Sequence, residues 1–285
     1  MPEDEREHGA PHLSADDWLA LLSTGDVTIE GRLPWSSNYS FLATVRSADA
    51  EVRAVYKPGK GERPLWDFGS CLYRREVAAY ELSAALGFGL VPETVLRLDG
   101  PLEDGSLQRF VEADFEQHYF SLLEEPAHHG RLRELAGFDL LLNNADRKSG
   151  HVLVDWDGAI WAIDNGLSFH PDPKLRTVIW DFAGEPVPEH VLDACRRLVD
   201  DGPPASLTRL LSAEECEALQ YRALQVLDRP RFPAPRGDHR SYPWPLVLGG
   251  GATTAPTPGP SSEEGGLPAA CGYLRLSRGP RSPKR

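Results

Sequence analysis

The chain has 285 residues, of which 41% are hydrophobic and 26% charged, a composition typical of a globular protein with room for one large domain or two lobes. The last 37 residues hold five Lys/Arg and two Asp/Glu, so residues 1–248 carry 25 basic and 41 acidic residues, a net charge of −16. Such an acidic body argues against nucleic acid and against an anionic membrane surface as partners.

No apolar run approaches the ~20 residues of a membrane-spanning helix, and we expect no stable membrane insertion. The N-terminus reads MPEDEREHG, which is neither a secretory signal nor a transit peptide. The four cysteines form no CxxC pair. This argues against a zinc site or a disulfide framework and favours a reducing cytoplasm.

The first element is a short helix. Residues 1–13 are expected to be disordered. Ser14 followed three residues later by Asp17 resembles a capping box, and Gly25 is a helix stop, so the sequence predicts a helix between them.

Alternating residues predict strands within 27–45 and over 51–56. The polar turn between the first two strands contains Ser36, Ser37 and Asn38. In a kinase-like fold the first hairpin covers the nucleotide phosphates with backbone amides and small side chains, and by such a resemblance these residues could do so here. An ordinary hairpin turn explains these residues about as well, because no GxGxxG is present.

The strand over 51–56 leads into Lys57, and a helix is predicted over 71–86. Glu76 lies one turn into that helix, with Glu81 about 140° away on another face. The intervening loop contains Asp-Phe-Gly at 67–69, which imitates a kinase motif. It precedes the helix, out of the kinase order, so we interpret it as a coincidence.

Strands are then predicted over 94–98 and 106–111, followed by an apolar helix over 131–142. Two further helices are predicted over 188–201 and 206–227. Residues 228–248 are rich in proline and arginine, as expected for a strap against the helices. Residues 249–285 are Gly, Pro, Ser and Thr with a basic end and are expected to be disordered.

The stretch 138–170 contains the strongest functional pattern. Short β-type runs at 151–154 and 159–163 flank an Asp-Gly hairpin turn. A hairpin brings its two ends together, and with them Asp146 and Asp164. Phosphoryl transfer uses two such carboxylates, one to orient the attacking oxygen and one to hold the metal at the phosphates.

Asp146-Arg147 followed by Ile-Asp-Asn-Gly at 163–166 resembles the phosphatidylinositol 3-/4-kinases and HipA-type kinases. The second motif is closest to the type II phosphatidylinositol 4-kinases, and the whole chain resembles a group of uncharacterised actinobacterial kinase-like proteins. The resemblance covers roughly residues 27–200.

The resemblance implies an α+β fold with two lobes, as in protein kinases. A small β-rich N-lobe is expected over 14–113 and a mainly helical C-lobe over 114–248. It also implies that Lys57, held by Glu76, contacts the α- and β-phosphates of ATP.

Further roles follow from the resemblance. Asp146 would orient or deprotonate the acceptor, and Arg147 would hold the catalytic loop or meet a phosphate. Lys148 could steady the transferred group or simply be solvated. Asp164 would bind Mg²⁺. The hinge residues Phe110, Val111 and Glu112 would meet the adenine through their backbone.

The sequence departs from the family at His151, where these kinases normally have a metal-binding asparagine. Imidazole suits manganese, zinc or iron better than magnesium. Three interpretations remain open: His151 binds another metal such as Mn²⁺, the enzyme works with one ion, or the site binds nucleotide with little turnover.

The function predicted is a cytoplasmic, ATP-dependent phosphotransferase acting on a protein or a small soluble molecule rather than a lipid. The alternatives are a nucleotide-binding pseudokinase that serves as an interaction module, and an AMP transferase on the same fold.

Overall fold

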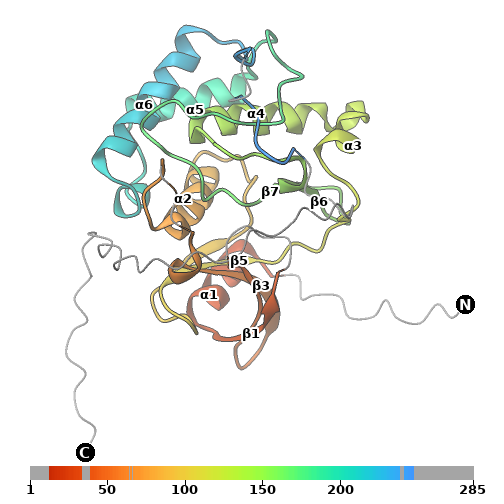
Figure 1. Cartoon of the computed structure of the whole chain (residues 1–285), viewed down its shortest axis with the longest axis vertical. Coiled ribbons are helices and arrows are strands. Elements are labelled where there is room, and N and C mark those ends of the chain that lie inside the picture. The colour runs from red at the N-terminus through yellow and green to blue at the C-terminus, as the bar shows by residue number, and fades with distance from the viewer. Residues whose placement is uncertain (1–12, 34–38, 64, 66, 238–240, 247–285) are drawn as a thin grey trace, which may run out of the picture. The chain divides into compact units, whose positions relative to one another are not determined.

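The computed structural model describes residues 13–33, 39–63, 65, 67–237 and 241–246 (Figure 1). Three predictions therefore lie outside the described residues: the order or disorder of 1–12, the phosphate-contacting turn Ser36-Ser37-Asn38, and the disorder of 249–285.

The predicted helices and strands are present in the predicted order, together with one short additional helix, α3 (Tyr119–Leu123). In chain order they are α1 (Ala15–Thr24), β1 (Asp26–Arg32), β2 (Phe41–Arg46), β3 (Glu51–Pro58), α2 (Leu72–Ala85), β4 (Thr94–Arg97), β5 (Gly105–Arg109), α3 (Tyr119–Leu123), α4 (His129–Leu142), β6 (Val152–Val154), β7 (Ile160–Ala162), α5 (Glu189–Asp200) and α6 (Ala213–Asp228). Short 3-10 helices are Gly59–Gly61, Pro126–His128, Ser149–His151 and Leu207–Arg209. The predicted helix 206–227 is divided, because α6 begins only after its capping residue Ser212.

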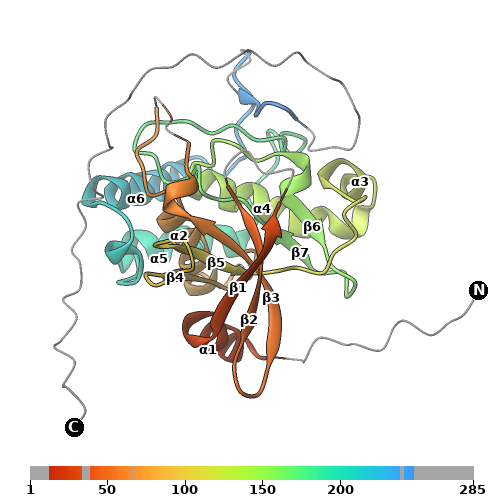
Figure 2. The same ribbon diagram turned by 60° about the horizontal axis from the view of Figure 1, so that its bottom comes forward.

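The first half of the chain forms a five-stranded antiparallel sheet in the order β1-β2-β3-β5-β4 (Figure 2). Val95 of β4 packs in the cluster that contains the buried face of α1, whereas the next residue, Leu96, packs against the cluster that contains α2. Successive strand residues point to opposite faces of a sheet. The helices α1 and α2 therefore cover opposite faces of the sheet at β4.

The capping box predicted for α1 is present. The Ser14 hydroxyl accepts from the backbone N–H of Asp17 at 3.2 Å, and the Asp17 carboxylate accepts from the N–H of Ser14 at 3.2 Å. The helix then buries Trp18, Leu21 and Leu22 against the sheet. This packing fixes the sheet on the face opposite to α2.

The larger hydrophobic core contains buried residues of α2, α4, α5 and α6, and of the β6–β7 hairpin. Because α2 contributes Val77, Ala78 and Leu82 to this core while it also contacts β4 and β5, it joins the sheet to the helical part. Helix α2 therefore fixes the position of any side chain that it directs toward β3.

The β6–β7 hairpin is held at its turn by Asp155, whose carboxylate accepts from the backbone N–H groups of Asp157 at 3.0 Å and Ala159 at 2.8 Å. Gly158 has φ +83°, the left-handed conformation that the predicted Asp-Gly turn requires.

In the described part of the chain, no helix is long and apolar enough to cross a membrane.

Candidate active site

Lys57 lies near the end of β3, and its Nζ is hydrogen-bonded to the Glu76 carboxylate of α2. The Glu76 side chain is only 4% exposed. The structure thus brings Glu76 to Lys57, rather than Glu81, which lies on another face of the helix. A strand lysine paired with a helix glutamate is the arrangement that active protein kinases need at the nucleotide phosphates.

Asp164 follows β7 and reaches the same lysine. Its Oδ1 accepts from Lys57 Nζ at 2.9 Å, and its side chain is 43% exposed. Burial alone would lower the pKa of Lys57, but Asp164 and Glu76 outweigh it and hold that pKa above its ordinary value. Burial would likewise raise the pKa of Asp164, but Lys57 outweighs it and the pKa is lowered. Both groups are therefore charged at neutral pH.

The backbone around Asp164 is tightly constrained. Asp164 has φ +57°, a conformation that non-glycine residues adopt rarely and often at functional sites. The next N–H, of Asn165, donates to Glu76 Oε2 at 2.9 Å. A Cβ at Gly166 would lie 3.2 Å from Glu76 Oε1. This close approach explains the glycine of the Ile-Asp-Asn-Gly motif.

Asp146 lies in the loop after α4, which ends at Asn143 in the left-handed conformation with φ +53°. The side chain of Asn144 accepts from the N–H of Asp146 at 2.9 Å, and Lys148 Nζ donates to Asp146 Oδ2 at 2.8 Å. Burial raises the pKa of Asp146 to about 6 despite the neighbouring Lys148. A carboxylate of this kind is well matched to accept a proton near neutral pH.

Arg147 is fully buried and holds the loop. Its guanidinium donates to Asp139 at 2.9 to 3.2 Å, to the Ile163 carbonyl at 2.7 Å and to Asn165 Oδ1 at 2.6 Å. Of the two roles expected for Arg147, this geometry matches the holding of the loop. A side chain with 0% exposure does not reach a phosphate in this conformation.

His151 ends the 3-10 turn of the same loop and is 2% exposed. Its Nε2 lies 3.2 Å from Asp164 Oδ2, and its Nδ1 lies 3.4 Å from the backbone nitrogen of Lys148. Burial lowers the pKa of His151 to about 3, so the ring is neutral at physiological pH.

A cleft opens at Lys57, Asp146 and Asp164. Its lining includes Lys57, Glu76, Asp146 and Asp164 of the predicted set and Gly166 of the Ile-Asp-Asn-Gly motif. It also includes the following residues that the sequence did not single out: Tyr39, Ser40, Pro58, Glu62, Leu72, Tyr73 and Leu167. The structure thus places four predicted site residues from four separate segments around one opening.

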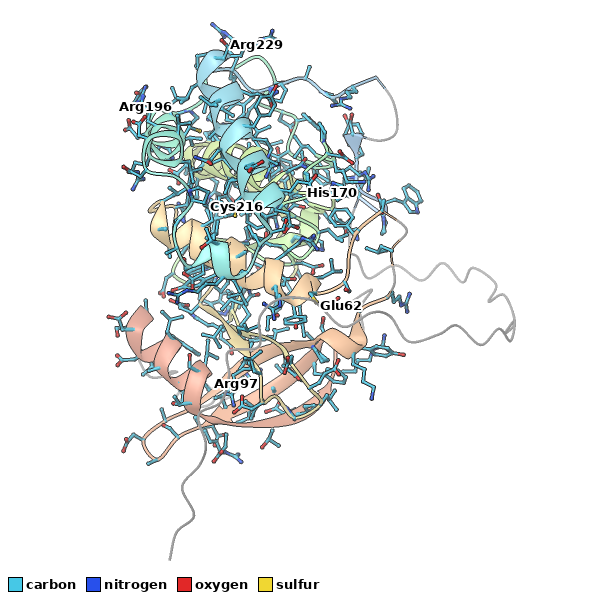
Figure 3. All side chains as sticks on the ribbon, turned by 90° about the vertical axis from the view of Figure 1, so that its left-hand side faces the viewer. Glu62, Arg97, His170, Arg196, Cys216 and Arg229 are labelled. Atoms are coloured by element: carbon cyan, nitrogen blue, oxygen red, sulfur yellow. The ribbon has the colours of Figure 1, made fainter. Side chains whose placement is uncertain are left out.

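Glu62 is one of the residues that the sequence did not single out. Its carboxylate accepts from the N–H groups of Cys71 at 2.8 Å and Tyr73 at 2.9 Å and so caps the start of α2. Figure 3 labels Glu62 near this helix. An acidic residue in a Gly/Pro-rich loop before a helix is a signal that could have located it.

The expected hinge residues are not among those that line the cleft. The N–H of Phe110 donates to the Arg53 carbonyl at 3.2 Å, and Glu112 pairs with the Arg53 side chain. Val111 is buried with Ala113 and Leu153 in a small cluster. Within the described residues, the N–H of Val111 makes no hydrogen bond.

No protein-family profile matches the chain. The chain is 39% identical over 267 residues to Protein Rv2133c of Mycobacterium tuberculosis (strain ATCC 25618 / H37Rv), an alignment that covers 81% of this chain and 95% of that protein. The chain belongs to the family of this mycobacterial protein.

Among solved structures, hydra Fam20 with sugar has a TM-score of 0.50 and 15% identity, covering 75% of this chain and 87% of that chain. The Helicobacter pylori proinflammatory kinase CtkA has a TM-score of 0.41 and 14% identity, covering 74% and 94%. The fold is α+β, bilobal and kinase-like, as the sequence predicted.

Proposed function

We propose that the chain is an ATP-dependent phosphotransferase of the atypical class that includes the phosphatidylinositol 3-/4-kinases, acting in the cytoplasm. The observation that carries this proposal is the contact of one lysine, Lys57, with both Glu76 and Asp164. In kinases the strand lysine meets the α- and β-phosphates, and the acidic residue of the metal-binding loop faces the metal bound to them.

The donor set fits a divalent cation that arrives with the nucleotide. Among the described residues, no three His, Cys, Asp or Glu side chains are grouped so as to hold a metal ion by themselves. Asp164 offers the exposed carboxylate, and the phosphate oxygens would complete the coordination, as Mg²⁺ usually requires. When bound, Mg²⁺ or Mn²⁺ would neutralise phosphate charge.

The proposed chemistry follows from the side chains. Asp146 accepts the proton of the acceptor hydroxyl as the hydroxyl oxygen bonds to the γ-phosphorus of ATP. The bond from that phosphorus to the β,γ-bridging oxygen breaks, and ADP leaves. Lys57 would stabilise the negative charge of the phosphates. Lys148 donates to Asp146 at 2.8 Å and would lie beside the transferred group.

The nucleotide base would lie at the hinge. The N–H of Val111 makes no hydrogen bond to any described residue, and Val111 packs with Ala113 and Leu153 in an apolar cluster. Both features support this placement, because a base can accept from a backbone N–H and pack against apolar side chains. For the acceptor, the acidic body favours a protein or a small soluble molecule over an anionic lipid.

A second candidate is a nucleotide-binding pseudokinase. It is favoured by His151, which stands where related kinases have a metal-binding asparagine. AMP transfer is a third candidate, which requires the nucleotide to bind in the reverse direction.

Mass spectrometry separates these candidates. The purified protein is incubated with Mg²⁺–ATP and a cytoplasmic extract, with Asp146→Asn as the control. Transfer of a phosphate that the control lacks supports the proposal. An AMP adduct supports nucleotidyl transfer, and tight ATP binding with neither adduct nor ATP hydrolysis supports the pseudokinase.

A further inference from the structure

His151 lies between the two loops of the site because the β6–β7 hairpin holds it there. Its carbonyl accepts from the N–H of Ile163 at 3.0 Å, so His151 lies opposite the residue that precedes Asp164. Its ring is buried, and Nε2 lies 3.2 Å from Asp164 Oδ2. The ring thus joins the catalytic loop to the Asp164 carboxylate.

The hydrogen bonds determine which ring nitrogen carries the proton. The backbone N–H of Lys148 can only donate, and it faces Nδ1 at 3.4 Å. Nδ1 must therefore be the acceptor, which leaves the ring proton on Nε2. The Nε2–H then points at a carboxylate oxygen, so its contact with Asp164 is a donated hydrogen bond.

We propose that His151 is a positioning residue that fixes the Asp164 carboxylate through an Nε2–H···Oδ2 hydrogen bond, and that it is not a metal ligand. This inference rests on the proposed function only in that Asp164 faces the nucleotide-bound cation. Oδ1 is held by Lys57 and Oδ2 by His151, so both oxygens are fixed while one lone pair of each stays available.

Asp164 needs such a partner for two reasons. Its side chain is partly exposed, so its carboxylate has room to move. Its backbone is in the left-handed conformation, which a non-glycine residue keeps only where neighbouring contacts hold it. A nitrogen whose lone pair is replaced by a proton does not bind metal. The chain would then supply one metal ligand, Asp164, and every donor to the metal would be oxygen, a set that suits Mg²⁺ as well as Mn²⁺.

The first test needs neither metal nor nucleotide. The protein is labelled with ¹⁵N-histidine, and long-range ¹H–¹⁵N correlation spectra are recorded near neutral pH, with His151→Gln used to assign the ring. The expected result is the Nε2–H tautomer, with Nδ1 unprotonated. A ring with its proton on Nδ1 overturns the proposal.

The second test uses matched variants. A glutamine can present an N–H donor near the position of Nε2, whereas leucine presents none. By calorimetry, the affinity for Mg²⁺–ATP should be about tenfold or more lower in His151→Leu than in the wild type, and within about threefold of the wild type in His151→Gln. The affinity for ATP in EDTA should be equal in all three proteins. An affinity of His151→Gln as low as that of His151→Leu, or an unchanged affinity of His151→Leu, contradicts the positioning role.

The third test looks for a metal–nitrogen bond. In the Mn²⁺–ATP complex of the wild type, pulsed electron spin resonance should detect no directly bound nitrogen. A nitrogen coupling that disappears in His151→Gln would make His151 a ligand and overturn the proposal. A wild type that fails to bind Mg²⁺–ATP instead overturns the proposed function, while the tautomer measurement still decides the role of His151.

Discussion

The pair of Lys57 and Glu76 gives a prediction at the scale of single residues. If both act on the same phosphates, Lys57→Ala and Glu76→Ala should not be additive, and the double variant should bind Mg²⁺–ATP about as weakly as the weaker single variant. For residues in contact, coupling of roughly 0.5–3 kcal/mol is expected. Calorimetry of the three variants measures it, with Glu81→Ala as the control on the same helix. Additive losses would mean that the two residues act independently.

Arg147 and Asp139 form a buried pair, with side chains 0% and 1% exposed. Arg147→Met leaves the Asp139 charge without its partner, so the free energy of unfolding should fall by about 3–5 kcal/mol. The double variant Arg147→Met with Asp139→Leu should recover part of this loss, but not all, because Asn165 and the Ile163 carbonyl lose their donor. Urea denaturation measures both. A loss below about 1 kcal/mol in the single variant would show that the pair does not hold the loop.

The raised pKa of Asp146, about 6, has two consequences of opposite sign. The protonated acid cannot accept a proton, so kcat/KM should fall about tenfold per pH unit below 6. An acid whose pKa is higher in the folded protein than its unfolded value of about 3.9 favours folding at low pH, and this contribution is lost as pH rises through about 6. Asp146→Asn should therefore raise the melting temperature, relative to wild type, more at about pH 8 than at about pH 4.

Melting curves of Asp146→Asn and the wild type at the two pH values test the second consequence. A difference in melting temperature that is the same at both would mean that Asp146 is not destabilised by burial. Asp172→Asn, with a side chain 80% exposed, is the control and should show little pH dependence.

At the scale of elements, the loop before α2 is fastened to the segment after Asp164. Asp67 accepts from Lys174 at 3.2 Å, and the Phe68 ring packs edge-on to His170 with 5.1 Å between centroids. Phe68 is also buried in a cluster that contains Ala145 of the catalytic loop. The Asp-Phe-Gly of this loop thus has a structural role unrelated to the kinase motif that it imitates.

Phe68→Ala should therefore loosen this attachment. Removing a buried phenylalanine costs about 3–5 kcal/mol in a full core, and less in this small cluster. Hydrogen exchange should become faster in residues 59–71 and 167–177, and Mg²⁺–ATP affinity should fall. Leu65→Ala is the matched control, since Leu65 lies in the same loop and is 39% exposed. Unchanged hydrogen exchange in both segments would show that the attachment does not contribute to their stability.

The position of each site residue within its helix or strand explains whether it could be predicted from the sequence. Lys57, Asp146 and Asp164 stand at or beside the ends of regular elements, and Glu76 one turn inside a helix, so their spacing is visible as strand, helix and hairpin patterns. The partner of Arg147 was hidden, because Asp139 lies within the apolar run of α4 and only its burial reveals its role. Contacts such as Arg75 with Glu215, 2.5 Å apart across distant segments, carry no local pattern.

At the scale of the whole molecule, α2 belongs to the core of the helical part and also carries Glu76 to the sheet. A nucleotide bound between Lys57 and Asp164 should therefore stabilise both parts together. At a concentration 100 times Kd, ligand binding adds about 2.7 kcal/mol to the free energy of unfolding, which for a chain of this size corresponds to about 5–10 °C in melting temperature. Thermal unfolding of the ligand-bound protein should show a single transition.

The most direct test of the account is calorimetry of Mg²⁺–ATP binding to the wild type and to Asp164→Ala, with Asp172→Ala as the exposed control. We predict binding to the wild type and to the control, and a loss of the Mg²⁺-dependent part of the affinity in Asp164→Ala with the fold intact by circular dichroism. Equal ATP and Mg²⁺ affinity in Asp164→Ala and the wild type would contradict the assignment of this cleft as a kinase-like nucleotide site.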